Sequence, residues 1–330
     1  MNVPLWVWIL TLGVTGVLLL VDVWIIGRRP HVPSTRETGR LLAFYIALAI
    51  VFGLGVWYFS GADFATQYFA GWVTEYSLSV DNLFVFLIIM AKFGVPEKLQ
   101  QSALMVGIVV ALILRGIFIA VGAAAINEFS WVFYLFGAFL IYTAVKLARE
   151  GQSDDDEYEE NRFLKWVEKR FPATNQWHGT KLFVVSNGSR IITPMFIVIL
   201  ALGTTDLLFA LDSIPAIYGL TQEPFLVLTA NIFALMGLRQ LYFLIGGLLK
   251  RLVYLGLGLA VLLAFIGAKL ILHAMHVNEL PFVNGGRHLT SAPEISIGQS
   301  LSVIIGILAI TTIASLLRTR KDNAAAITID

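Results

Sequence analysis

Two short stretches place pairs of carboxylates inside long apolar segments, and they are the strongest chemical signal in this sequence. In each stretch the two acids stand six residues apart, and a small polar residue directly follows the second acid. An ionised carboxylate at the centre of a bilayer costs about 2.5–3.5 kcal/mol. Either basic groups of the protein or a bound cation must therefore compensate the four charges. The residues are Glu75, Asp81 and Asn82 in the first stretch and Asp206, Asp212 and Ser213 in the second.

Oxygen ligands of this kind favour hard divalent ions, namely Mg²⁺, Ca²⁺ or Mn²⁺, over Zn²⁺ or Cu⁺. The four carboxylates would supply charge, and Asn82, Ser213 and Asn231 would supply neutral oxygens. We therefore predict an intramembrane metal site for a transported ion, with no permanently bound cofactor. The residues alone do not rank Mn²⁺ above Ca²⁺ or Mg²⁺.

An ion that must leave again needs a site that is close to neutral when empty. Four basic residues could compensate the carboxylates in that state: Arg115, Arg239, Lys146 and Lys269. Alternatively the carboxylates take up protons, because a neutral acid is far less costly in apolar surroundings. Either route suits an exchange of the ion against protons. A third interpretation is a salt-bridge network that only holds helices together, but both lysines lie near span ends, where they could reach the interface.

The composition excludes several classes of protein. Of 330 residues, 58% are hydrophobic and only 14% are charged, whereas soluble domains have about 25% charged residues. The sequence contains no cysteine, which removes disulfides, thiolate metal sites and thiol redox chemistry. It also shows no phosphate-binding loop and no nucleophile elbow. We expect a polytopic all-α membrane protein that is neither an enzyme nor a nucleic-acid binder.

Nine segments approach or exceed the roughly 20 apolar residues that cross a bilayer. The first is expected to be a retained span, because no basic region precedes it and no cleavage site follows it. Basic residues gather in alternate loops, which predicts an outside N-terminus and a cytoplasmic C-terminus in a bacterial plasma membrane. The expected spans are 4–26, 40–59, 66–91, 99–122, 130–147, 192–217, 225–247, 252–274 and 298–317.

Spans three to five resemble a copy of spans six to eight. Each acid of the first stretch lies 131 residues before its counterpart in the second stretch. Arg115 and Arg239 are separated by 124 residues, and Lys146 and Lys269 by 123. An odd number of spans lies between the copies, so they would have opposite orientations, as in transporters with inverted repeats. The predicted organisation is two N-terminal spans (1–60), a first repeat (61–147), a cytoplasmic loop (148–191), an inverted second repeat (192–275), an outer loop (276–297) and a final span with its tail (298–330).

Helix geometry predicts a break in the third and sixth spans. Residues six apart in an unbroken helix point about 120° away from each other, so both carboxylates would reach one ion only with difficulty. Gly203 and Pro215 flank the second acid pair and favour a break there. The first copy has Gly71 but no proline, which is a weaker signal.

Three further features have less specific interpretations. The long cytoplasmic loop contains an acidic run at 154–160, interpreted as a solvated linker, and an amphipathic surface helix at 161–170. His273 and His276 are interpreted as interfacial polar residues, with an exit site for a transition ion as the alternative. Asp22 is expected to be solvated or paired with Arg28 or Arg29.

The two acid motifs also resemble the paired signatures of the TerC family of integral membrane proteins. These are Glu-Tyr-Ser-Leu-Ser-Val-Asp-Asn-Leu-Phe-Val-Phe at 75–86 and Asp-Leu-Leu-Phe-Ala-Leu-Asp-Ser-Ile-Pro-Ala at 206–216. The resemblance covers about 40–275 and extends to the Alx-type manganese exporters and the LysE superfamily. It implies Mn²⁺ export from the cytoplasm through the four acids. We take the family's association with tellurium resistance as indirect, because this sequence has no thiol.

The leading hypothesis is a secondary transporter that exports Mn²⁺ through a midplane site, with its two repeats rocking to expose that site alternately. The alternative is an accessory factor that delivers metal to exported proteins or assists membrane-protein assembly. The expected partners are a divalent ion and the lipid bilayer, and the homo-oligomeric state and contacts with secretion-associated proteins are open. Ion flux into liposomes that contain this chain alone distinguishes the two hypotheses.

Overall fold

The computed structural model describes residues 1, 3–28, 32–129, 131–150, 170, 172–186, 189–245, 253–278, 280, 288–289 and 293–327. Nine segments within these ranges are helical, long and apolar enough to cross a membrane, and each overlaps one of the nine predicted spans. The prediction of a polytopic helical membrane protein is confirmed. The helices are α1 (Leu5–Arg28), α2 (Thr35–Ser60), α3 (Ala62–Lys92), α4 (Glu97–Glu128), α5 (Val132–Glu150), α7 (Pro194–Tyr218), α8 (Pro224–Met236), α9 (Leu238–Ile245), α10 (Leu255–His276) and α11 (Ile297–Ile327).

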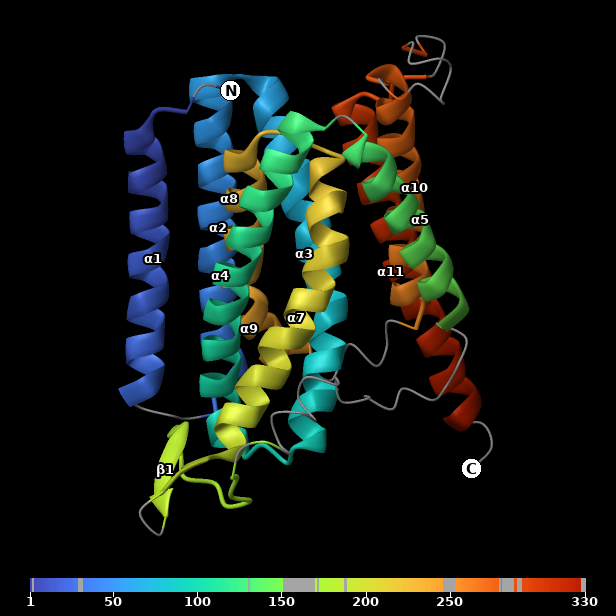
Figure 1. Ribbon diagram of the computed structural model, residues 1–330. Helices are drawn as coiled ribbons and strands as arrows, with labels where there is room; N and C mark the ends of the chain where they lie inside the picture. The colour runs from blue at the N-terminus through green and yellow to red at the C-terminus, as the bar shows by residue number, and fades with distance from the viewer. Residues whose placement is uncertain are drawn as a thin grey trace.

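The helices alternate in direction, and α1 begins and α11 ends at opposite ends of the bundle (Figure 1). A single residue, Gly61, joins α2 to α3. Its φ of 99° is a conformation that side chains other than glycine rarely adopt, so this tight reversal depends on glycine.

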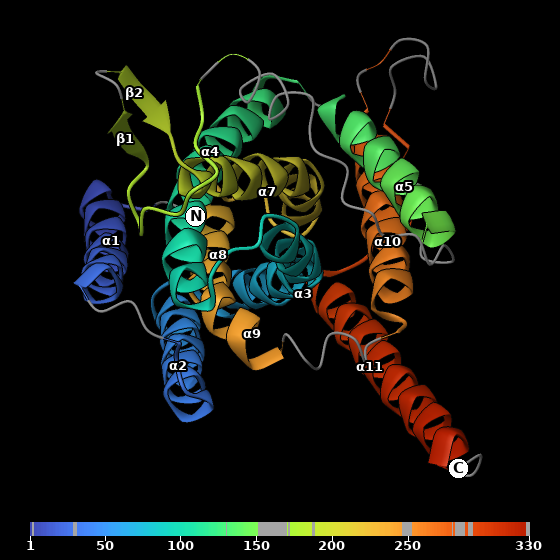
Figure 2. The ribbon, with the colours of Figure 1, turned by 90° about the horizontal axis from the view of Figure 1, so that it is seen from below.

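Viewed along the bundle, α3, α4, α7 and α8 form the centre, with α1 and α2 on one side and α5, α10 and α11 on another (Figure 2). Helix α3 packs on α8, and α4 packs on α7. These are the contacts that a twofold exchange of the two proposed repeats would interchange. The inverted repeat itself stays a prediction.

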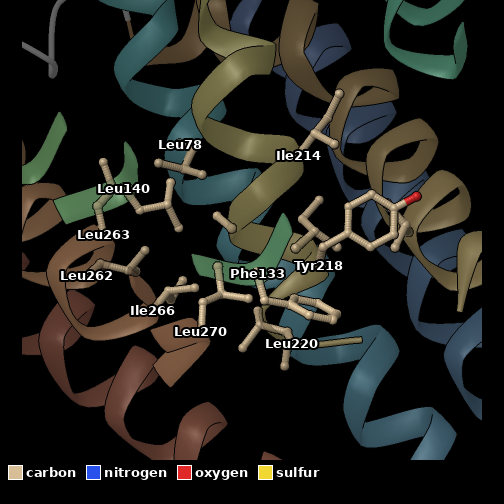
Figure 3. Packing of buried hydrophobic residues seen from close by; sticks show 14 of the residues in the cluster. Leu78, Phe133, Leu140, Ile214, Tyr218, Leu220, Leu262, Leu263, Ile266 and Leu270 are labelled. Atoms are coloured by element: carbon tan, nitrogen blue, oxygen red, sulfur yellow. The ribbon is translucent and has the colours of Figure 1, made fainter. Parts of the chain in front are cut away.

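Helices α5 and α10 pack closely because two glycines face each other. A side-chain carbon at Gly137 would lie 2.8 Å from the carbonyl oxygen of Gly267, and one at Gly267 would lie 2.9 Å from that of Gly137. Small residues allow this close approach between helices in membranes. Around the pair lies an apolar cluster shared with α3 and α7 (Figure 3). It includes Leu78, Leu140, Ile214 and Ile266.

The predicted breaks in the third and sixth spans are wrong, because α3 and α7 are each one helix. Pro215 lies in the last turn of α7, so the backbone bond that it removes is lost only near the helix end. The hydroxyl of Thr204 donates to the carbonyl of Leu200 in its own helix. The break lies instead in the seventh span, where α8 ends at Met236 and α9 begins after Gly237.

A short antiparallel hairpin was not predicted. Strands β1 (Phe183–Ser186) and β2 (Ser189–Ile192) pair at the end of the bundle at which α11 also ends (Figure 1). The sequence between them is Asn-Gly, a strong hairpin signal that the loop interpretation overlooked. The acidic run at 154–160 and nearly all of the expected amphipathic helix at 161–170 fall outside the described residues.

Candidate functional site

The centre of the bundle holds one arginine between two acids. Arg115 of α4 donates from Nε to Asp206 Oδ2 at 2.9 Å and from Nη2 to Asp206 Oδ1 at 3.1 Å, a bidentate pair. Its Nη1 donates to Oε1 of Glu75 on α3. The side chains of all three residues are at most 2% exposed. Each residue lies near the middle of its helix, so the cluster is at mid-depth of the bundle.

Neutral oxygens complete the surroundings of Arg115. Its Nη1 also donates to Ser213 Oγ at 3.1 Å and to Asn231 Oδ1 at 2.9 Å. Arg115 thus gathers both acids and two of the three neutral residues that the sequence proposes as ligands. We use the name acid centre for Glu75, Asp206, Ser213 and Asn231 together with Arg115.

The acid centre has unequal charges and one unsatisfied oxygen. Two carboxylates face one guanidinium, which leaves a net charge of −1 if both acids are ionised. Oε2 of Glu75 is buried and forms no hydrogen bond with any described residue. A buried acceptor without a partner is costly, and a charged one more so. The centre can therefore accept a further cation or a proton.

The second acid of the α7 pair, Asp212, points elsewhere, as expected for a continuous helix. Asp212 accepts a 2.9 Å hydrogen bond from Thr143 Oγ1 of α5. It lines a cavity of about 200 Å³ together with Asn82 and Lys146, and apolar side chains from α3, α5, α7 and α10 form the rest of the wall. Asp81 lies in α3, but its side chain is not among those described.

The structure therefore divides the predicted ligands into two groups. Glu75, Asp206, Ser213 and Asn231 meet at the acid centre, whereas Asn82 and Asp212 line the smaller cavity. Among the described residues no three acids or histidines come together as a metal site. The metal-binding role of the seven residues stays a prediction.

The four basic residues have four different surroundings. Arg115 binds the acid centre, and Lys146 lines the cavity beside Asp212. Arg239 of α9 instead pairs with Asp22 of α1, Nη2 to Oδ2 at 3.0 Å. Lys269 lines a separate outer cavity.

The partners that the sequence suggested for Asp22 were Arg28 and Arg29, whose side chains are not among those described. Asp22 itself is only 13% exposed and is not freely solvated. It accepts from Arg239 and from the hydroxyl of Tyr45 on α2, the latter at 2.8 Å. Its partners come from distant parts of the chain, a pairing that local sequence could not indicate.

The outer cavity has a volume of about 830 Å³. It lies between the start of α3, the C-terminal ends of α7 and α10, and the start of α11. His273 and His276 both line it. The Nε2 atom of His273 lies 2.8 Å from Gln222 Nε2, and its ring packs edge-on against Phe133. These contacts fit polar residues at an aqueous entrance, and the lining acids are Asp63, Glu223 and Glu294.

Sequence reasoning missed Thr143, Ser79 and Tyr45. Thr143 bonds Asp212, and Ser79 Oγ lies 3.5 Å from Oε1 of Glu75. A signal existed for Thr143, because it is a polar residue inside an apolar span, one turn from Lys146.

Comparison with known proteins gives consistent matches over most of the chain. The model of the integral membrane protein TerC family matches residues 60–323. An uncharacterized membrane protein of Mycobacterium tuberculosis (strain H37Rv) is 49% identical over 325 residues, which is 97% of this chain and 82% of that protein. The putative membrane-bound redox modulator Alx of Escherichia coli (strain K12) is 34% identical over 309 residues, 91% of each chain. No solved structure matches.

Proposed function

Because the chain belongs to the TerC family of integral membrane proteins, we propose that it exports a hard divalent cation, Mn²⁺ above all, through the acid centre. The observation that carries the proposal is the unequal charge there: Glu75 and Asp206 share the single Arg115, and Oε2 of Glu75 has no partner among the described residues. The preference for Mn²⁺ rests on the family resemblance. Oxygen ligands alone accept Ca²⁺ and Mg²⁺ as well.

A purely structural network is the main rival, and its charges would be expected to balance. A buried ion pair adds little net stability compared with apolar packing, and an excess buried charge is a cost. With both acids ionised, the acid centre contains that excess at mid-depth of the bundle. A site that must attract a dication and then release it is expected to retain such an excess negative charge.

Arg115 acts in this proposal as a built-in counter-ion. While no metal is bound, its guanidinium occupies the space between the two acids and keeps the site nearly neutral. An arriving dication competes with it for Glu75 and Asp206, and Ser213 and Asn231 offer neutral oxygens to the ion. The competition weakens binding enough for release.

The two cavities suggest a route to and from the centre. Asp212, Asn82 and Thr143 offer oxygens in the smaller cavity, and Asp81 is proposed to act with them. The outer cavity, with three acids in its wall, is suited to the exit side. The basic residues gathered in alternate loops support an orientation in which this exit and the N-terminus face the outside of the cell. The contacts of α3 with α8 and α4 with α7 support rocking of two inverted repeats.

The proposed activity of this chain is transport and not redox chemistry. The name of its Escherichia coli relative refers to redox modulation, but this sequence contains no cysteine to oxidise or reduce.

The experiment is Mn²⁺ flux in liposomes that contain only the purified chain. We expect the native protein to move Mn²⁺ and the Glu75→Gln and Asp206→Asn variants to match empty liposomes. Glu97→Gln is the matched control, because Glu97 is exposed at the start of α4. Flux through Glu75→Gln at the native rate, with normal incorporation, would refute the site. An inactive native chain would favour the accessory-factor alternative.

A further inference from the structure

Asp22 is a carboxylate inside the apolar helix α1, and it is paired with residues of other helices. It is the only charged residue between Leu5 and Ile25 of α1, a helix whose large apolar side chains are mostly exposed. A carboxylate in such a span is costly unless it is paired. Its partners are Arg239 of α9 and the hydroxyl of Tyr45.

Arg239 lies directly after the break in the seventh span, and that break lies against α3 at the residue next to Glu75. A side-chain carbon at Gly237 would lie 3.4 Å from the ring of Tyr76, the residue next to Glu75. Helix α9 also packs along α3. A long side chain two residues beyond Gly237 can therefore turn towards α1 or towards α3.

Two buried groups of opposite charge are left unsatisfied, one on α9 and one on α3, the two helices that pack on each other. Nη1 of Arg239 and Oε2 of Glu75 each form no hydrogen bond in the described part of the chain. Each would satisfy the other. In addition, Arg239 is the counterpart of Arg115 in the proposed repeat and lies 124 residues further along the chain. Under an exchange of repeats, Arg239 takes the place of Arg115.

We propose that Arg239 is a second counter-ion for the acid centre, and that Asp22 is a positioning residue that holds it away while Arg115 occupies that centre. The inference rests on the proposed function and deepens it. When the transport cycle releases Arg115 from Glu75, Arg239 leaves Asp22 and α9 turns relative to α2. The charge of Glu75 is then compensated by Arg115 in one state of the cycle and by Arg239 in the other. The protein can therefore return to its starting conformation with no metal bound.

A charge exchange separates this role from simple anchoring of α1. Asp22→Arg and Arg239→Asp would each place a like-charge pair in the bundle, and both single variants should lose thermal stability. The double variant restores an ion pair with the charges reversed. We expect it to regain the native melting temperature in detergent, yet to leave Mn²⁺ uptake at the level of empty liposomes. Native uptake in the double variant would overturn the proposal.

A cross-link tests the same movement if the double variant fails to regain its stability. The chain has no cysteine, so Leu42→Cys and Gly237→Cys can be introduced as the only two; a side-chain carbon at Gly237 would lie 3.3 Å from Cδ1 of Leu42 on α2. We expect oxidation to stop Mn²⁺ uptake and a reductant to restore it. Ile313→Cys with Leu317→Cys, one turn apart and both exposed on α11, is the control pair. Undiminished uptake in the oxidised Leu42–Gly237 pair would overturn the exchange.

These outcomes remain distinguishable from failure of the proposed function. If native protein and Glu75→Gln give equal uptake, the acid centre is not the transport site. If Glu75→Gln is inactive while the charge-exchanged double variant transports, only the role of Arg239 is wrong.

Discussion

Replacing Arg115 with glutamine should make the stability of the protein depend strongly on Mn²⁺. Arg115 donates five hydrogen bonds in the acid centre, three of them to Oδ1 and Oδ2 of Asp206 and Oε1 of Glu75. A glutamine amide has only two N–H donors and no charge. Removing one partner from a buried ion pair typically costs about 3–5 kcal/mol, because the other charge is left without compensation.

The same substitution removes the competitor of the metal. A ligand present at about 100 times its dissociation constant stabilises the folded state by about 2.7 kcal/mol. At equal Mn²⁺ concentration, Arg115→Gln should therefore gain more stability than the native protein. The assay is reversible unfolding in mixed micelles with and without Mn²⁺, and Arg36→Gln, at an exposed arginine of α2, is the control. Equal Mn²⁺ stabilisation of Arg115→Gln and native protein would refute the role of Arg115 as a counter-ion.

Three further predictions concern the acids and the packing. In Glu75→Gln, the single acid Asp206 faces the single Arg115, so the melting temperature of this variant without metal should equal or exceed the native value. Mn²⁺ should no longer raise that melting temperature. A large loss of stability in Glu75→Gln would contradict the proposed excess of negative charge in the acid centre. Thr143→Val removes the hydrogen bond to Asp212, which is worth about 1.5–3 kcal/mol for a charged partner, and should slow Mn²⁺ flux at unchanged protein level. Gly137→Ala should lower the melting temperature by forcing α5 from α10, whereas Gly13→Ala, with nothing within 4 Å of the added carbon, should not.

The spans were predictable because bilayer thickness imposes a simple rule on sequence. Apolar runs of about 20 residues identify the crossing helices without any knowledge of packing. The same rule could not locate the helix break. Pro215 and Gly203 favoured the sixth span, but Pro215 falls in the last turn of α7, and the interruption follows Gly237. A glycine breaks a helix only where its neighbours also favour the bend.

The site was only partly accessible to sequence reasoning. The cost of charge in an apolar span identified Glu75, Asp206 and Arg115 as residues that need partners. Which of them meet depends on helix rotation and packing, and the pairing of Asp22 with Arg239 joins positions 217 residues apart. The spacing of six residues did predict one feature correctly: in a continuous helix it makes Asp206 and Asp212 point in different directions around α7.

An anomalous diffraction map of the protein crystallised with Mn²⁺ tests the central claim most directly. The account predicts a peak between Glu75 and Asp206, with the Arg115 guanidinium moved off at least one of the two carboxylates. Arg115 still bound to both acids at saturating Mn²⁺, with every peak elsewhere, would contradict it.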